Sequence, residues 1–297
     1  MNRKLRLLVD QVLVDDKPYN VVTVYKGGMG RVWLLERAFD EGFDPIYRHR
    51  IAVKTFDFMK DEHAIEKELN IWISLSHPSI VTLKKIGRLN YRLAAIMPLL
   101  YGSLEDAINS SGTLSEKDAS IILLTIAKGL DYAWATYKIL HLDIKPSNIL
   151  VENISNLSVK IADWGIARIS SDQQLLGIKT GNSNINMAGD LTKYSAGTPL
   201  YMSPERISGY WSLSPAVDIY SLGMIAIRIK TGILPFSSET LIQMGEIVSG
   251  SYYKKAIQLL QNCSGPFRNF CLKCINPNLD ERLKSYDELF AKLNTII

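Results

Sequence analysis

A short stretch of the chain combines a carboxylate, an ammonium group and an amide at close spacing. Asp143, Lys145 and Asn148 lie within the run His-Leu-Asp-Ile-Lys-Pro-Ser-Asn at 141–148, and Asp163 follows fifteen residues after Asn148. One carboxylate can orient an attacking hydroxyl, while an amide and a second carboxylate can hold a magnesium ion against phosphates. These residue types at this spacing predict phosphoryl transfer from a metal-bound nucleotide.

The stretch resembles the catalytic loop of protein kinases, and Asp-Trp-Gly at 163–165 resembles their metal-binding D-F-G. The resemblance implies that Asp143 orients the substrate hydroxyl and that Lys145 neutralises charge on the transferring phosphoryl group. It assigns metal binding to Asn148 and Asp163. The D-x-K-P-x-N form is similar to that of Ser/Thr kinases, whereas tyrosine kinases usually carry arginine and alanine in this segment.

Within these two motifs, two residues depart from the family pattern. Leu142 stands where many members carry an arginine that pairs with a phosphate on the activation segment. We therefore expect activity that does not strictly depend on that phosphate. Trp164 replaces phenylalanine but remains a large aromatic residue that can pack. The resemblance places it in a hydrophobic column with Trp72, Leu83 and His141.

Glycines at 27, 28 and 30 lie between two predicted strands. Glycine permits the close backbone approach and the dihedrals that a phosphate-covering loop needs, although three glycines also make an ordinary hairpin turn. The pattern resembles the kinase loop G-x-G-x-x-G-x-V starting at position 25, with Tyr25 in place of the first glycine. The resemblance implies nucleotide contacts at Gly27, Gly28, Gly30, Val32, Ala52, Lys54, Met97, Leu100 and Leu150.

Lys54 ends the strand pattern Ile-Ala-Val-Lys at 51–54 and could contact nucleotide phosphates as a point charge. The alternative is a solvated lysine at a strand end. In the kinase family, the helix glutamate that pairs with this lysine lies ten residues before the proline of a His-Pro turn. Here Pro78 selects Glu68. The resemblance thus implies a catalytic set of Lys54, Glu68, Asp143 and Lys145.

A further motif, Gly-Thr-Pro-Leu-Tyr-Met-Ser-Pro-Glu at 197–205, resembles the kinase segment that docks peptide substrates. The resemblance implies that Thr198 contacts the catalytic loop and that Glu205 forms a buried ion pair with Arg282. It also implies that Asp218 tethers the backbone of the catalytic loop. Small-molecule kinases of related fold generally lack this segment, so the motif disfavours that class.

Hydrophobic periodicity predicts the elements that position these residues. Runs of β-branched and aromatic residues predict strands at 20–25, 31–36, 51–56, 79–88 and 91–97. Helical spacing predicts a helix at 61–75 with an apolar face made of Ile65, Leu69, Trp72 and Ile73. After Pro98 the pattern is mostly helical, with Ser115 as a helix N-cap and a strand at 159–161.

These elements, together with the resemblance, predict an α+β fold with two lobes, similar to that of protein kinases. A small antiparallel β-rich N-lobe with one main helix is expected to precede a larger, mostly helical C-lobe. Residues 1–19 are expected to form an N-terminal extension with room for an extra strand, and 20–297 the kinase domain. The N-lobe would span about 20–97, the hinge about 97–101 and the C-lobe about 102–297.

The composition excludes several classes of protein. A net charge of +4 without a concentrated basic stripe argues against nucleic-acid binding. No apolar run approaches the ~18 residues of a membrane helix, and the N-terminus does not resemble a signal peptide, so we expect a cytoplasmic protein without a membrane partner. Cys263, Cys271 and Cys274 lack the fourth ligand of a structural zinc site, which favours reduced, packed thiols.

The resemblance covers about residues 20–290 and implies an ATP-dependent Ser/Thr protein kinase of the bacterial branch that uses Mg²⁺ or Mn²⁺. Its implied partners are protein substrates bearing Ser or Thr, and a homodimer would allow autophosphorylation on the hydroxyl-rich segment after Asp163. The alternative is a pseudokinase that binds nucleotide and a protein partner as a scaffold. Tyr25, Leu142 and Trp164 favour the alternative, whereas the presence of every residue with a chemical role favours the enzyme.

Overall fold

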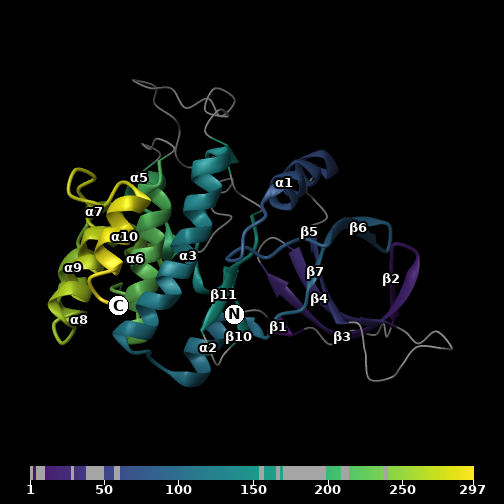
Figure 1. Cartoon of the computed structure of the whole chain (residues 1–297), viewed down its shortest axis with the longest axis horizontal. Coiled ribbons are helices and arrows are strands. Elements are labelled where there is room, and N and C mark those ends of the chain that lie inside the picture. Colours follow the sequence, from purple (N-terminus) through teal and green to yellow (C-terminus); the bar gives the residue numbers. More distant parts are fainter. Residues whose placement is uncertain are drawn as a thin grey trace. The chain divides into compact units, whose positions relative to one another are not determined.

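The computed structural model describes residues 3–4, 11–27, 30–37, 50–56, 61–153, 157–164, 168–169, 199–208, 214–236 and 240–297 (Figure 1). The chain divides into two compact units, Met1–Leu100 and Tyr101–Ile297. The first is rich in antiparallel strands and contains one helix within its described residues, and the second is mostly helical. This architecture agrees with the predicted α+β fold class.

The first unit is built on one antiparallel sheet with the strand order β1-β3-β2-β6-β7-β5-β4. Because β3 pairs with β4 as well as with β2, the strands β2 to β7 close into a ring. The strand bounds are Arg3–Lys4 (β1), Gln11–Val14 (β2), Lys17–Gly27 (β3), Gly30–Arg37 (β4), Arg50–Phe56 (β5), Lys85–Leu89 (β6) and Arg92–Pro98 (β7).

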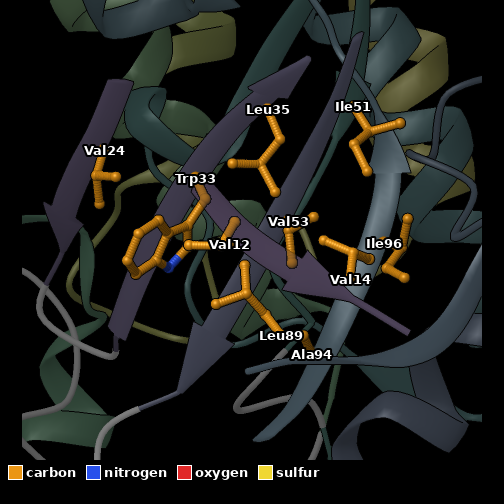
Figure 2. Packing of buried hydrophobic residues seen from close by; sticks show 10 residues of the cluster. All are labelled: Val12, Val14, Val24, Trp33, Leu35, Ile51, Val53, Leu89, Ala94 and Ile96. Carbon is orange, nitrogen blue, oxygen red and sulfur yellow. The ribbon is translucent and has the colours of Figure 1, made fainter. Parts of the chain in front are cut away.

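The inside of this ring is the core of the first unit (Figure 2). Strand alternation sends every second side chain inward, so β4 contributes Trp33 and Leu35, and β5 contributes Ile51 and Val53. The remaining members are Val12, Val14, Val24, Leu89, Ala94 and Ile96. The Trp33 indole donates to Thr55 Oγ1 at 3.0 Å, which satisfies its one polar group.

Helix α1 (Glu62–Ser74) begins at Asp61, whose side chain caps the helix by accepting from the His63 amide. It buries Ile65, Leu69 and Trp72, as the helical spacing predicts. The inclusion of Ile73 on that face is wrong, because its side chain is 43% exposed. Each residue advances about 100° around the helix axis, so Ile73 lies beside the buried stripe that contains Trp72 and not on it.

The strand predicted at 79–88 is also partly wrong, since β6 begins only at Lys85. Ile80, Val81 and Leu83 are buried without belonging to a strand. The Val81 carbonyl accepts from the Trp72 indole at 2.8 Å. A side chain of α1 therefore provides the hydrogen bond to this backbone carbonyl, whereas the apolar pattern predicts a hydrogen bond to a neighbouring strand.

The second unit contains a three-stranded sheet, β11-β10-β8, a two-stranded sheet, β12-β9, and a set of helices (Figure 1). Its strands are β8 (Gly102–Ser103), β9 (Ile139–Leu140), β10 (Ile149–Asn153), β11 (Ser158–Ile161) and β12 (Arg168–Ile169), with 3₁₀ turns at Pro146–Asn148 and Pro199–Tyr201. Its helices are α2 (Leu104–Ser111), α3 (Glu116–Tyr137), α5 (Pro204–Ile207), α6 (Ala216–Thr231), α7 (Thr240–Ser249), α8 (Tyr252–Leu259), α9 (Gly265–Cys274) and α10 (Tyr286–Leu293).

Helix α6 forms the centre of this unit, because its residues from Ala216 to Ile227 are all buried and it packs against α3 and α9. Helix α3 begins at the predicted N-cap, where Ser115 Oγ accepts from the Asp118 amide at 3.0 Å. Every helix within the described ranges is too short or too polar to cross a bilayer.

The three cysteines of the second unit are free thiols. Cys271 and Cys274 on α9 are fully buried, and Cys263 precedes the helix in a partly buried position. Burial raises the pKa of all three thiols above the ordinary cysteine value. They are therefore protonated, weakly nucleophilic groups at neutral pH.

Candidate active site

The catalytic stretch follows β9 and is held by a carboxylate of α6. Asp218 is completely buried and accepts from the His141 amide at 2.8 Å and from the Leu142 amide at 2.9 Å. Burial raises the pKa of Asp218, while these two amides oppose the rise. The predicted tether thus has the geometry that its implied role needs.

The His141 ring is fixed from both nitrogens. Its Nδ1 accepts from the Asp143 amide at 3.2 Å, so Nε2 carries the proton that is donated to the Ala162 carbonyl at 3.0 Å. The ring lies 4.6 Å from that of Trp164, centroid to centroid, and both residues are fully buried. The contact between Trp164 and His141 is therefore present, with the two rings tilted by 57°, while Trp72 and Leu83 are buried within the first unit.

Asp143 lies at the centre of a small polar group. Its Oδ2 accepts from Lys145 Nζ at 2.7 Å and from Asn148 Nδ2 at 2.9 Å. Burial raises the pKa of Asp143, Lys145 lowers it, and the nearby charge of Asp163 raises it further. The aspartate therefore has a base strength above that of an exposed carboxylate, and its orientation is set by two donors.

Asn148 and Asp163 are tied together through the backbone. The Asn148 carbonyl accepts from the Ala162 amide at 2.8 Å, directly before Asp163. Asn148 Nδ2 donates to the Asp143 backbone carbonyl at 2.8 Å as well as to its carboxylate, so the side-chain oxygen is the atom that remains for a ligand. An amide oxygen and a carboxylate fit a hard cation such as Mg²⁺.

Four of the predicted nucleotide contacts share one face of the sheet in the first unit. Val32 pairs with Lys54 across β4 and β5, and Ala52 pairs with Met97 across β5 and β7. Cross-strand partners lie on the same face, and Val53 between Ala52 and Lys54 points into the core. The four residues therefore lie together on the face opposite the core.

Lys54 is only 6% exposed, with its Nζ 5.3 Å from the centroid of the Phe56 ring. This burial contradicts the alternative of a solvated lysine at a strand end. Glu68 is half-buried on α1, three residues after buried Ile65 and four before buried Trp72, so it lies on the buried side of the helix. Its pairing with Lys54 stays a prediction.

Gly27 and Gly30 face each other where β3 turns into β4. Gly30 has φ +146°, and a Cβ there would lie 2.0 Å from the Thr55 carbonyl oxygen. Only glycine fits this position, so the requirement for glycine at position 30 is steric and goes beyond that of an ordinary turn. Gly28 lies outside the described residues, as does Thr198.

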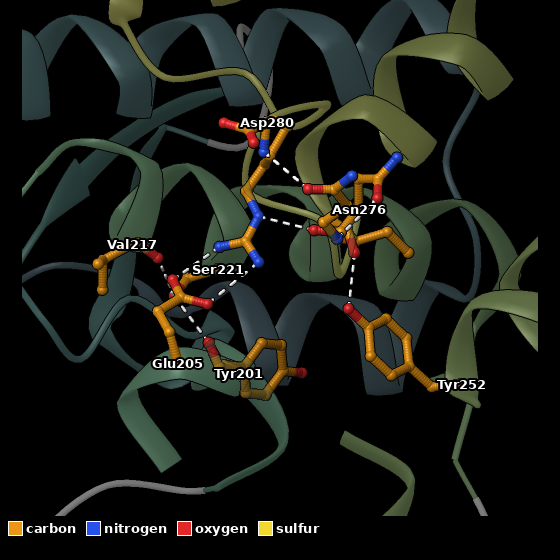
Figure 3. A network of polar contacts seen from close by, with 10 residues as sticks. Tyr201, Glu205, Val217, Ser221, Tyr252, Asn276 and Asp280 are labelled. Atoms are coloured by element: carbon orange, nitrogen blue, oxygen red, sulfur yellow. Dashed lines mark hydrogen bonds and ion pairs between the residues drawn. The ribbon is translucent and has the colours of Figure 1, made fainter. Parts of the chain in front are cut away.

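The predicted ion pair of Glu205 and Arg282 is present and bidentate (Figure 3). The two nitrogen–oxygen distances are 2.7 and 3.1 Å, and the Arg282 side chain has no exposed area. Arg282 Nε also donates to the Asn276 carbonyl at 2.8 Å, and the guanidinium lies 5.1 Å from the Tyr220 ring centroid. This pair anchors α5 to the segment before α10.

Two residues that the sequence reasoning missed complete this region. Ser221, one turn after Asp218 on α6, donates to the Tyr201 carbonyl at 2.7 Å (Figure 3). Arg206 Nη1 donates to the Leu142 carbonyl at 2.5 Å. Both contact backbone oxygens of distant segments, which leave no mark in the sequence. The two remaining residues predicted to contact the nucleotide, Leu100 and Leu150, are half-buried.

The family model described as "Protein kinase domain" matches residues 27–292. The serine/threonine protein kinase OSK3 of Oryza sativa subsp. japonica is 29% identical over 80% of this chain and 43% of its own length. The serine/threonine-protein kinase PknD of Protochlamydia amoebophila (strain UWE25) is 28% identical, covering 94% of this chain and 30% of that protein. The chain thus spans less than half the length of these curated relatives.

Among solved structures, Rad53 1-466 in complex with AMP-PNP is similar with a TM-score of 0.67. It is 24% identical, and the match covers 95% of this chain and 64% of that one. At this identity the likeness concerns the fold, and it confirms the predicted kinase fold. The Ser/Thr protein kinase relatives extend over most of the chain.

Proposed function

The family match establishes that this chain belongs to the protein kinase domain family, and from that premise we propose that it transfers the γ-phosphoryl group of ATP to Ser or Thr hydroxyls of protein substrates. The observation that carries the proposal is the group around Asp143. A buried carboxylate held by Lys145 and Asn148 is arranged to orient a hydroxyl.

Asp143 would accept the hydroxyl proton, helped by a pKa that burial raises. Lys145 is partly exposed, so its ammonium group can bond Asp143 and still face the transferring phosphoryl group. The same lysine lowers the pKa of Asp143 and so opposes the rise that burial causes. Both residues therefore act on the proton and on developing charge.

The remaining site residues would bind ATP and its cation. Asn148 and Asp163 would hold Mg²⁺, with Mn²⁺ as an alternative, and a bound cation neutralises charge on the phosphates. Lys54 and Glu68 would form the phosphate-contacting pair, and backbone amides of the glycine turn would meet phosphate oxygens. Val32, Ala52 and Met97 offer an apolar sheet face for the base.

The proposal extends to branch, location and autophosphorylation. The match to a Protochlamydia kinase supports the bacterial branch, although rice kinases match equally well. Free, buried thiols suit a reducing cytoplasm. The hydroxyl-rich segment after Asp163 would be the target of autophosphorylation within a homodimer, and it lies largely outside the described residues.

The test compares the wild type with Asp143→Asn in an assay of phosphate transfer from labelled ATP with Mg²⁺ to a general Ser/Thr substrate. Loss of the base should lower kcat about 10²- to 10⁴-fold, because general base catalysis contributes that much. Asp280→Asn is the matched control, since that carboxylate is largely exposed, pairs with Lys284 and has no part in the proposed site. Equal turnover by wild type and Asp143→Asn would contradict the proposal. Nucleotide binding without turnover by the wild type would instead support the pseudokinase.

A further inference from the structure

Leu142, the residue before Asp143, has an unusual backbone. Its φ is +65°, which costs a non-glycine residue on the order of 1–2 kcal/mol. Such a conformation persists only where the surroundings determine it. The contacts that hold Leu142 therefore also hold the Asp143 backbone.

Three separate contacts fix Leu142. Its side chain is 5% exposed and packs in a cluster with Leu140 and Val217. Its amide donates to Asp218 at 2.9 Å. Its carbonyl accepts from Arg206 Nη1 at 2.5 Å. Helix α6 thus holds the side chain and the N–H, through Val217 and Asp218, and α5 holds the C=O, through Arg206.

Arg206 brings the third contact from the peptide-docking segment. It lies on α5 directly after Glu205, which is bonded twice to Arg282. A guanidinium donor makes a charge-assisted hydrogen bond, which is stronger than one between neutral groups. The charge of Arg206 also favours the ionised form of Asp218, whose pKa burial raises, and so supports the second contact as well.

We propose that Arg206 is a positioning residue that joins the docking segment to the catalytic loop, so that Asp143 is held for reaction only while α5 is anchored. The inference rests on the proposed kinase activity for its kinetic consequence. Arg206 touches a backbone carbonyl of the loop, so it acts through Leu142 on Asp143. Arg206 and Leu142 are 64 residues apart, so this hydrogen bond joins two segments that are distant in the sequence.

The experiment compares Arg206→Met, which keeps length but loses the donors, with Arg206→Lys, which keeps one charged donor. Loss of a charged hydrogen bond predicts a fall in kcat on the order of tenfold to a hundredfold for Arg206→Met. The KM for ATP should stay within about twofold, because the nucleotide contacts are untouched, and Arg206→Lys should recover part of kcat. Amide hydrogen exchange at 141–143 should quicken in Arg206→Met.

Arg268→Met is the matched control, since Arg268 is a partly exposed arginine of α9 that has no part in the proposed site. A kcat for Arg206→Met equal to that of this control would overturn the proposal, as would a rise in KM for ATP with kcat unchanged. If Arg206→Met does not fold, Arg206→Lys decides: slower turnover with local exchange at 141–143 supports the link, and wild-type values for both overturn it.

A wild-type chain without turnover would defeat the proposed function but not this test. Hydrogen exchange then decides alone. Faster exchange confined to 141–143 in Arg206→Met supports the positioning role. Exchange that is unchanged, or that rises equally throughout the second unit, overturns it.

Discussion

At the scale of single residues, the structure explains why a leucine is accommodated at position 142. The side chain is buried beside Leu140 and Val217, so an apolar residue suits this position in this chain. The other departure, Trp164, is fully buried against the His141 ring. Neither residue supplies an atom that would contact the phosphates or the metal. The two departures therefore leave the chemical groups of the site intact.

Gly30 gives a prediction at the same scale. Gly30→Ala would place a Cβ 2.0 Å from the Thr55 carbonyl oxygen at a φ of +146°, so the turn between β3 and β4 must move. We expect a loss of roughly 1–3 kcal/mol in unfolding free energy and a higher KM for ATP. Thermal unfolding and steady-state kinetics measure the two effects.

Gly245→Ala is the control for that substitution. Gly245 is exposed within α7, with open space where its Cβ would lie, so alanine should be neutral or slightly stabilising. Equal behaviour of the two variants would show that the tight approach at Gly30 has no consequence for folding or for ATP.

At the scale of elements, α6 organises two functional segments of the second unit. Asp218 holds the catalytic loop, and Ser221, three residues later on the same face, holds the Tyr201 carbonyl. Because α6 is buried along most of its length, both contacts start from a rigid support. The helix thereby positions the backbone at His141 and Leu142 and the backbone at Tyr201.

The anchor of α5 leads to a prediction about stability. Arg282→Met leaves Glu205 as a buried carboxylate without its bidentate partner, which should cost about 3–5 kcal/mol. Lys284→Met is the matched control, because the Lys284–Asp280 pair is largely exposed and should contribute little. Thermal unfolding of both variants provides the comparison, and equal midpoints would contradict the assigned weight of the buried pair.

Local patterns predicted most elements of the fold because their causes are local. The run of strand-forming residues at 51–56 and the Ser115 cap are set by neighbouring residues, and both the strand and the cap are present. The errors at Ile73 and at the start of β6 have tertiary causes. Trp72 is the last residue of the buried stripe on α1. Its indole donates to the Val81 carbonyl, which would otherwise be free to pair with a neighbouring strand.

The candidate site divides in the same way. Asp143, Lys145 and Asn148 were predictable because their spacing within one loop brings them together. Arg206 and Ser221 were not, because each bonds a backbone carbonyl many residues away, and a carbonyl has no sequence signature. The shared face of Val32 and Lys54 depends on strand register, which one sequence does not specify.

At the scale of the whole molecule, the candidate residues are distributed over both compact units. The first carries Lys54, Glu68 and the glycine turn, and the second carries the residues proposed as base and metal ligands and the proposed docking segment. Each unit has its own core, so the residues of each half are positioned by their own unit. The second unit alone holds every group that would act on the substrate hydroxyl.

Regulation is the property of the whole molecule that follows from this arrangement. The candidate catalytic loop has the buried Leu142 where many family members carry a phosphate-pairing arginine, and its backbone is held by Asp218 and Arg206. We therefore expect phosphatase-treated protein to keep at least about half of its initial rate. A twofold change in rate corresponds to a change in activation free energy smaller than RT, which is about 0.6 kcal/mol. Initial rates should be taken before autophosphorylation accumulates, with mass spectrometry of 165–198 to confirm an unmodified segment. Activity that disappears on dephosphorylation and returns with phosphate on that segment would contradict phosphate-independent assembly of the site.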